Sequence, residues 1–172
     1  MVTYADLFTP NLFFVTNNTV GGEAVLANEL MMRVLRTVLM TVQKQHKFRL
    51  VGYVFLPDHV HLLIEPLGRV VLDQVMAAVH QHFQADYQQV LGIPGAMLLW
   101  EWPYQAQRVA DVDDLMRRLD YLHYAPVHQR LVEKPEAWPY SSYGDWVAQG
   151  LYAPGWGWSL PAHLAGKARG KR

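Results

Sequence analysis

Length, composition and charge already exclude several classes of protein. The chain has 172 residues with 15 Lys and Arg, 15 Asp and Glu and no cysteine. This length suits one domain with a full hydrophobic core. The lack of cysteine excludes disulfides, thiolate zinc sites and cysteine nucleophiles, and it favours a reducing cytoplasm. The balanced charge gives no general signal for nucleic acid. Residues 1–10 lack the pattern of a secretion signal and no apolar run reaches membrane-spanning length, so we expect no membrane partner.

The first half of the chain predicts three strands and one long helix. Residues 11–17 are rich in β-forming side chains and predict a strand. Apolar residues then recur at three- and four-residue steps from Glu23 to about His46, which predicts a helix. Residues 48–56 predict a second strand, and Pro57-Asp58 interrupts the run. A third strand follows, from His59 to Ile64 or Glu65, and so short a connection implies antiparallel pairing.

The second half predicts two helices around a last strand. A helix is expected over about 72–91, followed by a strand or hairpin in residues 97–109. Asp111 is a suitable N-cap for a helix that runs to Pro126. This order predicts an α+β domain of ferredoxin-like type, with helices packed on one face of an antiparallel sheet. No linker divides residues 1–172, and a loosely ordered basic tail is expected from Trp156 onward.

The basic tail is the one strongly charged segment. Its four cations are Lys167, Arg169, Lys171 and Arg172, with no acidic residue among them. Such an end is usually only solvated. The sharper interpretation is an arm that contacts the phosphates of a nucleic acid.

Two histidines in the third predicted strand are candidate metal ligands. His59 and His61 are two residues apart, so alternation along a strand places both on the same face. Two imidazoles at this spacing can converge on one divalent ion. The alternative is that they are two polar side chains on the wet face of a half-buried strand. The spacing alone leaves both interpretations open.

A tyrosine in the last predicted helix stands apart from its buried stripe. Leu115, Leu119 and Leu122 form that stripe, whereas Tyr121 falls on a flank of the helix. A tyrosine kept for core packing would be expected on the leucine side. Amphipathic tyrosines are nonetheless common at helix borders, so the position by itself does not assign a function.

Three stretches, taken together, resemble a known family. Residues 13–16 (Phe-Phe-Val-Thr), residues 53–63, which contain Pro-Asp-His-Val-His, and residues 119–143 occur in that order. The third stretch contains Asp-Tyr-Leu-His-Tyr-Ala-Pro-Val and later Trp-Pro-Tyr-Ser-Ser. They resemble the motifs "P-(D/N)-H-x-H", "D-Y-I-H-x-N-P-V" and "W-P-x-S-S" of REP-associated tyrosine transposases, a branch of the single-tyrosine HUH transposases. The resemblance spans roughly residues 11–146.

The resemblance implies a fold, a reaction and a substrate. His59 and His61 would lie on a central strand and hold Mg²⁺ or Mn²⁺ at a scissile phosphate of single-stranded DNA. The hydroxyl of Tyr121 would attack and form a 5′-phosphotyrosine link, and a second transesterification would rejoin strands. The implied targets are hairpins of repetitive extragenic palindromes with an adjoining single strand. The active unit would be a monomer or a homodimer.

One position departs from the family motif. The usual third metal ligand is an amide four residues after the tyrosine, and this chain has Ala125 there. In the interpretation we favour, water fills the position and activity persists with weaker metal affinity. In the second interpretation, another side chain replaces the ligand, with His128 the nearest candidate although Pro126 should kink the helix before it. The third interpretation is a protein that binds hairpin DNA and has lost cleavage.

A metal-dependent hydrolase of small molecules is the remaining alternative. It would need a general base or a carboxylate ligand near the histidine pair. Glu65 shares the face of His61 but lies about 13 Å farther along the strand. His123, two residues from Tyr121, lies on another side of the helix, where a hydrogen-bonding or packing role is expected.

Overall fold

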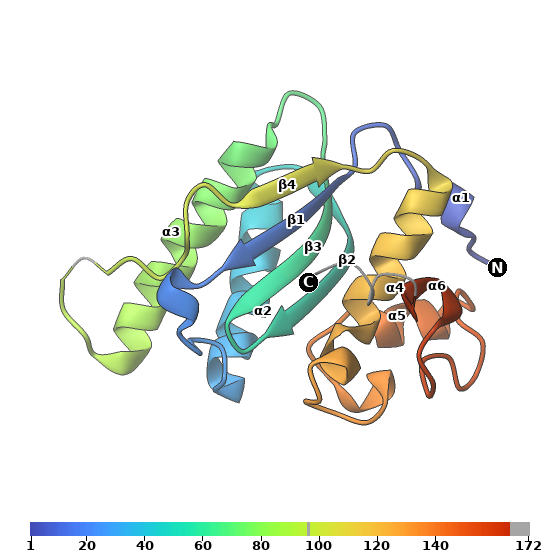
Figure 1. The fold of residues 1–172 in the computed structure, drawn as a ribbon. Coiled ribbons are helices and arrows are strands. Elements are labelled where there is room, and N and C mark those ends of the chain that lie inside the picture. Colours follow the sequence, from blue (N-terminus) through green and yellow to red (C-terminus); the bar gives the residue numbers. More distant parts are fainter. Residues whose placement is uncertain (96, 166–172) are drawn as a thin grey trace, which may run out of the picture.

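The fold is built on a four-stranded antiparallel sheet. The computed structural model describes residues 1–95 and 97–165. The strands are β1 (Phe13–Asn18), β2 (Phe48–Leu56), β3 (His59–Pro66) and β4 (Gln105–Arg108), in the order β2-β3-β1-β4 (Figure 1). The His-x-His strand β3 is therefore an inner strand, as predicted. Pairing sets His61 opposite Val54 of β2 and Thr16 of β1.

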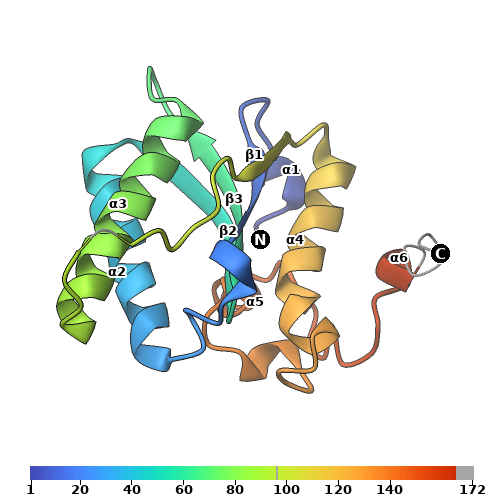
Figure 2. The ribbon, with the colours of Figure 1, turned by 60° about the vertical axis from the view of Figure 1, so that its left-hand side comes forward.

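Two layers of helices enclose the sheet. The pair α2 (Glu29–Gln45) and α3 (Leu72–Leu91) covers one face, and α4 (Val112–His128) lies on the other (Figure 2). The shorter helices are α1 (Tyr4–Leu7), α5 (Tyr143–Ala148), α6 (Ala162–Ala165) and the 3₁₀ turns η1 (Val20–Gly22) and η2 (Pro135–Ala137). The α+β class is confirmed. The expectation that all helices pack on one face is wrong.

The residues of β3 explain why both faces are covered. Val60, Leu62 and Ile64 pack in the core cluster of α2 and α3, whereas Leu63 packs in the cluster of α4. Residues 60–64 are all buried, His61 included. A continuous apolar run of this kind is typical of a strand buried on both sides, since a strand with one wet face alternates apolar and polar residues.

Several element boundaries differ from the predictions. The helix expected from Glu23 begins at Glu29, where the Asn28 side chain caps it by accepting a bond of 2.8 Å from the Leu30 amide. Only Gln105–Arg108 of the expected strand or hairpin forms a strand. Helix α4 continues through Pro126 to His128, and the Gln129 amide still donates to the Ala125 carbonyl at 2.9 Å.

Trp156, where the tail was expected to begin, is packed against two aromatic side chains. Its ring lies 4.4 Å from that of Tyr152 and 5.8 Å from that of Tyr143. A loosely ordered tail after this residue stays a prediction. The basic residues 167–172 lie outside the described residues. No helix in the described ranges is long and apolar enough to cross a lipid bilayer.

Helix α4 approaches the sheet closely at Gly52. A Cβ added there would lie 2.5 Å from Leu119 Cδ1 and 3.4 Å from Leu122 Cδ2. Both leucines are fully buried, so neither can move away without disturbing the core. The missing side chain of Gly52 therefore sets the distance between α4 and β2.

Gly52→Val should destabilise the fold by about 1–3 kcal/mol through overpacking. Urea unfolding would measure the loss. The control is Gly144→Val, at an exposed position where an added Cβ meets nothing within 4 Å. Equal stability of the two variants would contradict the close approach.

Candidate active site

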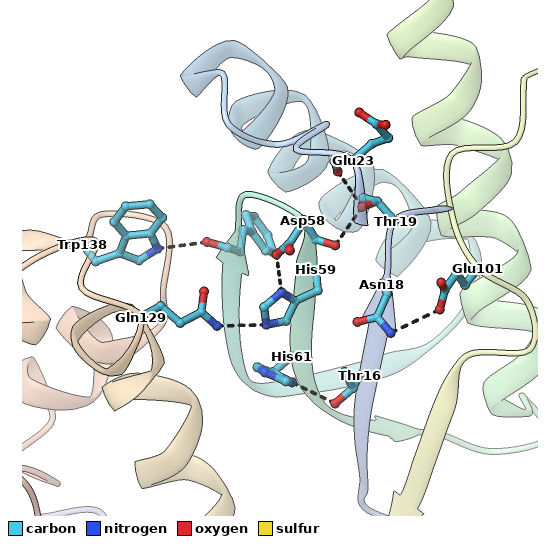
Figure 3. Close-up of polar contacts among 11 residues, drawn as sticks. Thr16, Asn18, Thr19, Glu23, Asp58, His59, His61, Glu101, Gln129 and Trp138 are labelled. Atoms are coloured by element: carbon cyan, nitrogen blue, oxygen red, sulfur yellow. Dashed lines mark hydrogen bonds and ion pairs between the residues drawn. The ribbon is translucent and has the colours of Figure 1, made fainter. Parts of the chain in front are cut away.

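The two histidines of β3 lie side by side at one end of the sheet. Their ring centroids are 5.0 Å apart with planes at 79° (Figure 3). His61 is buried, and its Nδ1 shares a hydrogen bond of 2.8 Å with the Thr16 hydroxyl of β1. Its Nε2 is buried without a hydrogen-bond partner. Burial and the neighbouring His59 lower the pKa of His61 to about 3, so the ring is neutral near pH 7.

His59 is oriented by the carboxylate that precedes it. Its Nδ1 lies 2.6 Å from Asp58 Oδ1 (Figure 3). A carboxylate accepts, so Nδ1 carries the proton and the lone pair of the neutral ring is on Nε2. The amide nitrogen of Gln129 lies 3.3 Å from that Nε2.

This arrangement fits a divalent cation. Histidines that bind metals usually donate their other N–H to a carboxylate or a similar acceptor, as His59 does to Asp58. When His61 donates from Nδ1 to Thr16, its Nε2 also keeps a free lone pair. A cation would satisfy this otherwise orphaned buried nitrogen. Within residues 1–95 and 97–165, no group of three His, Asp or Glu side chains could hold a metal.

Tyr121 meets the histidine pair from the opposite wall. Its ring centroid lies 5.4 Å from that of His61 and 6.3 Å from that of Phe14 in β1. The side chain is 43% exposed although it belongs to a helix that packs on the sheet. The prediction that Tyr121 lies on a flank of its helix is therefore confirmed.

A cleft of about 360 Å³ lies between α4 and the sheet. The sheet contributes Phe14, Thr16, His61, Gln105 and Gln107, and the helices contribute Asp114, Arg117, Arg118, Tyr121, His163 and Leu164. The cleft thus holds Tyr121, the histidines His61 and His163, and two guanidinium groups. Arg118 lies over the ring of Phe14 and bonds Asp114 at 2.9 Å, which fixes its position.

Buried polar contacts hold α4 in its orientation. Asp120 accepts hydrogen bonds from Tyr4 at 3.1 Å and Tyr152 at 2.9 Å, and its other oxygen lies 2.9 Å from His163 Nε2. Burial raises the pKa of the Asp120 carboxyl. His123 is fully buried between the hydroxyls of Tyr152 and Ser142, at 2.7 and 2.8 Å. Its hydrogen-bonding role agrees with the expectation from the sequence.

Three of the predicted site residues lie together in the structure, and a fourth, His128, lies apart from them. His59, His61 and Tyr121 converge, whereas His128 is exposed and has no hydrogen bond or ion pair to either histidine in the described part of the chain. Gln129 was missed, because no motif or spacing in the sequence points to it. A helix continued through Pro126 would have indicated it, because Gln129 follows Ala125 by one turn.

The fold and the geometry of this site agree with the arrangement expected from the sequence motifs. An antiparallel sheet with two adjacent histidines on an inner strand, faced by a tyrosine from a neighbouring helix, is the arrangement that the resemblance to HUH transposases implies. No protein-family model matches the chain. It is 23% identical over 156 residues to the REP-associated tyrosine transposase of Escherichia coli, covering 90% of this chain and 89% of the relative.

Further comparisons agree. A provisionally named REP-associated tyrosine transposase of Haemophilus influenzae is 26% identical over 125 residues, which cover 66% of this chain and 69% of that relative. The resemblance seen in the motifs is thereby confirmed.

Solved structures share the fold. One is a REP-associated tyrosine transposase bound to a REP hairpin, with a TM-score of 0.74 and 21% identity over 96% of this chain and 93% of that one. Another is a provisionally named transposase of Deinococcus radiodurans, with a TM-score of 0.50 and 19% identity over 62% and 85% of the two chains.

His123→Gln should change how stability depends on pH. Burial lowers the pKa of His123 from 6.5 to about 3, so below pH 6.5 the unfolded chain binds a proton that the folded chain does not. Wild-type stability therefore falls as the pH drops below 6.5, by about 1.4 kcal/mol per pH unit for this residue. Glutamine does not titrate. Urea unfolding between pH 7 and 4 should give a slope shallower by that amount, and parallel curves would contradict the assignment.

Proposed function

We propose that the protein is a metal-dependent endonuclease and strand transferase that acts on palindromic hairpin DNA with an adjoining single strand. The observation that carries this proposal is the placement of Tyr121 against His61, with a nucleophile candidate and a metal-ligand candidate on opposite walls of one cleft. The similarity to REP-associated tyrosine transposases, one of which is bound to a REP hairpin, supports the substrate class.

The proposed reaction is a transesterification at a DNA phosphate. The phenol oxygen of Tyr121 forms a bond to phosphorus while the bond from phosphorus to the 3′-oxygen breaks. The phenol proton passes to solvent, and the departing 3′-oxygen takes up a proton to become a hydroxyl. The 5′-phosphotyrosine link keeps the energy of the phosphodiester, so a 3′-hydroxyl can later reverse the step and join strands without an energy cofactor.

The remaining residues position the reactants. His59 and His61 would hold Mg²⁺ or Mn²⁺, which supplies Lewis-acid activation of the phosphate when bound. Asp58 keeps the His59 ring in the tautomer that leaves Nε2 free, and the Thr16 hydroxyl accepts from His61 Nδ1 when that ring is in the corresponding tautomer. Arg117 lines the cleft beside Tyr121 and can neutralise a backbone phosphate.

A protein that binds hairpins without cutting them is the second candidate. The observation in its favour is Ala125, which is buried in the apolar cluster of α4 and has no donor atom for a metal. The small-molecule hydrolase has less support. Its candidate carboxylate, Glu65, bonds Arg49 at 2.7 Å and so is already paired.

Tyr121→Phe should abolish a covalent protein–DNA adduct that the wild-type protein forms. Purified protein would be mixed with labelled hairpin DNA carrying a single-stranded extension and with Mn²⁺. Adducts would be counted on a denaturing gel. Phenylalanine keeps the ring contact with His61 but has no nucleophilic oxygen, so DNA affinity should persist while the adduct disappears. Tyr124→Phe, on the same helix beside Trp156, is the matched control and should form the adduct normally.

Other outcomes would separate the two candidates. Hairpin binding by the wild-type protein without an adduct in any divalent metal would favour the binding protein. In that case Ala125→Asn, which restores an amide at the family position, should create or strongly raise cleavage. An adduct that survives Tyr121→Phe would rule out Tyr121 as the nucleophile.

A further inference from the structure

We propose that the side-chain amide of Gln129 is the third protein ligand of the metal site, in place of the ligand that Ala125 cannot supply. This inference rests on the proposed function, because it takes His59 and His61 as the other two ligands. It differs from the sequence-based suggestion of His128 and from a site completed by water alone.

The first support is a direct contact. The Gln129 amide nitrogen lies 3.3 Å from His59 Nε2, the ring atom that Asp58 leaves with a free lone pair (Figure 3). Without a cation the NH₂ group donates to that lone pair. Rotating the terminal amide group by 180° exchanges the positions of its nitrogen and oxygen and leaves the shape of the side chain unchanged. The carbonyl oxygen then faces the position at which the imidazole lone pair points.

The second support is the geometry of the helix. Gln129 follows Ala125 by four residues, so it lies on the same side of α4 one turn nearer the helix end. The backbone N–H of Gln129 donates a hydrogen bond of 2.9 Å to the Ala125 carbonyl, which keeps Gln129 in helical register. Glutamine also has one methylene more than asparagine, and this extra length helps it to reach back toward β3.

The third support is the way α4 ends. The amide of Arg130 donates to the Val127 carbonyl at 3.0 Å, and that of Leu131 donates to the Pro126 carbonyl at 2.9 Å. These two bonds make a Schellman motif with Gln129 as the C-cap. Arg130 has φ of 59°, a left-handed conformation that glycine usually fills at this position. The helix end is thus fixed by specific bonds, and Gln129 is held beside the histidine pair.

The ligand chemistry is consistent with Mg²⁺ or Mn²⁺. An amide oxygen is a hard, neutral ligand of the kind these ions accept. Two neutral imidazoles and one neutral amide leave the full double charge of the ion available to a DNA phosphate. In the described residues, no other His, Asp or Glu forms a group of three with His59 and His61. The Gln129 amide, which contacts His59, is therefore the side chain that can serve as the third protein ligand.

Metal affinity tests the inference without any use of catalysis. Mn²⁺ binding to the DNA-free protein would be titrated by the electron paramagnetic resonance signal of free Mn²⁺. Gln129→Ala should weaken binding on the order of 10-fold or more, because loss of even an outer-sphere partner costs that much. Gln129→Glu should bind at least as tightly as wild type, since a carboxylate offers an oxygen with added negative charge. Gln149→Ala removes an exposed glutamine from the C-cap of α5 and should leave affinity unchanged.

His59→Ala separates the possible failures. If it abolishes Mn²⁺ binding while Gln129→Ala binds as wild type does, the amide is not a ligand and the inference is wrong, although the proposed function stands. If neither wild type nor Gln129→Glu binds Mn²⁺, both the inference and the metal dependence of the proposed function are wrong. Weakened binding in Gln129→Ala with retention in Gln129→Glu supports the inference, and it also excludes a folding defect at this helix end.

Discussion

The orientation of α4 depends on two buried polar side chains, Asp120 and His123. Asp120 bonds tyrosines from both ends of the chain, Tyr4 and Tyr152, and His123 shares the second of these. A buried polar group that loses its partner costs about 1–3 kcal/mol, so rotation of the helix about its axis is strongly opposed. Tyr121 lies between these two residues in sequence, about 100° around the helix from Asp120 and about 160° from His123. Its 43% exposure toward the cleft is therefore a consequence of what its neighbours must bury.

The sheet imposes a second constraint, which divides the histidine pair into a fixed and an adjustable member. His61 lies where β3 pairs with β1 and β2 and is covered by α4, so it is buried and bonded to Thr16. His59 begins the same strand and is partly exposed. Its two hydrogen-bond partners are Asp58, which precedes it in sequence, and Gln129 at the end of α4. In the proposed metal site, His61 would anchor the cation while His59 adapts.

Much of this arrangement could be predicted from local rules. Alternation placed His59 and His61 on one face, and the leucine stripe placed Tyr121 on a flank; both follow from backbone periodicity. The helices on both faces were missed because the order of the elements was taken to indicate a ferredoxin-like domain, which has its helices on one face of the sheet. Gln129 was missed because Pro126 was expected to kink the helix. Proline near the C-terminal end removes one donor but need not end the helix. The Schellman bonds that close the helix at Gln129 are not evident in a sequence that has arginine at the position usually filled by glycine.

The departure at Ala125 also has a structural reason. Helix α4 lies so close to β2 that only glycine fits at position 52, and Leu119, Leu122 and Ala125 fill the remaining space as one apolar cluster. A small apolar residue at 125 suits this contact, and a polar amide there would need a partner that the cluster does not offer. One turn later the helix has passed the edge of the contact and its side chains are exposed. An amide ligand moved from 125 to 129 would thus keep its direction toward the histidines while the core beneath α4 stays free of polar groups.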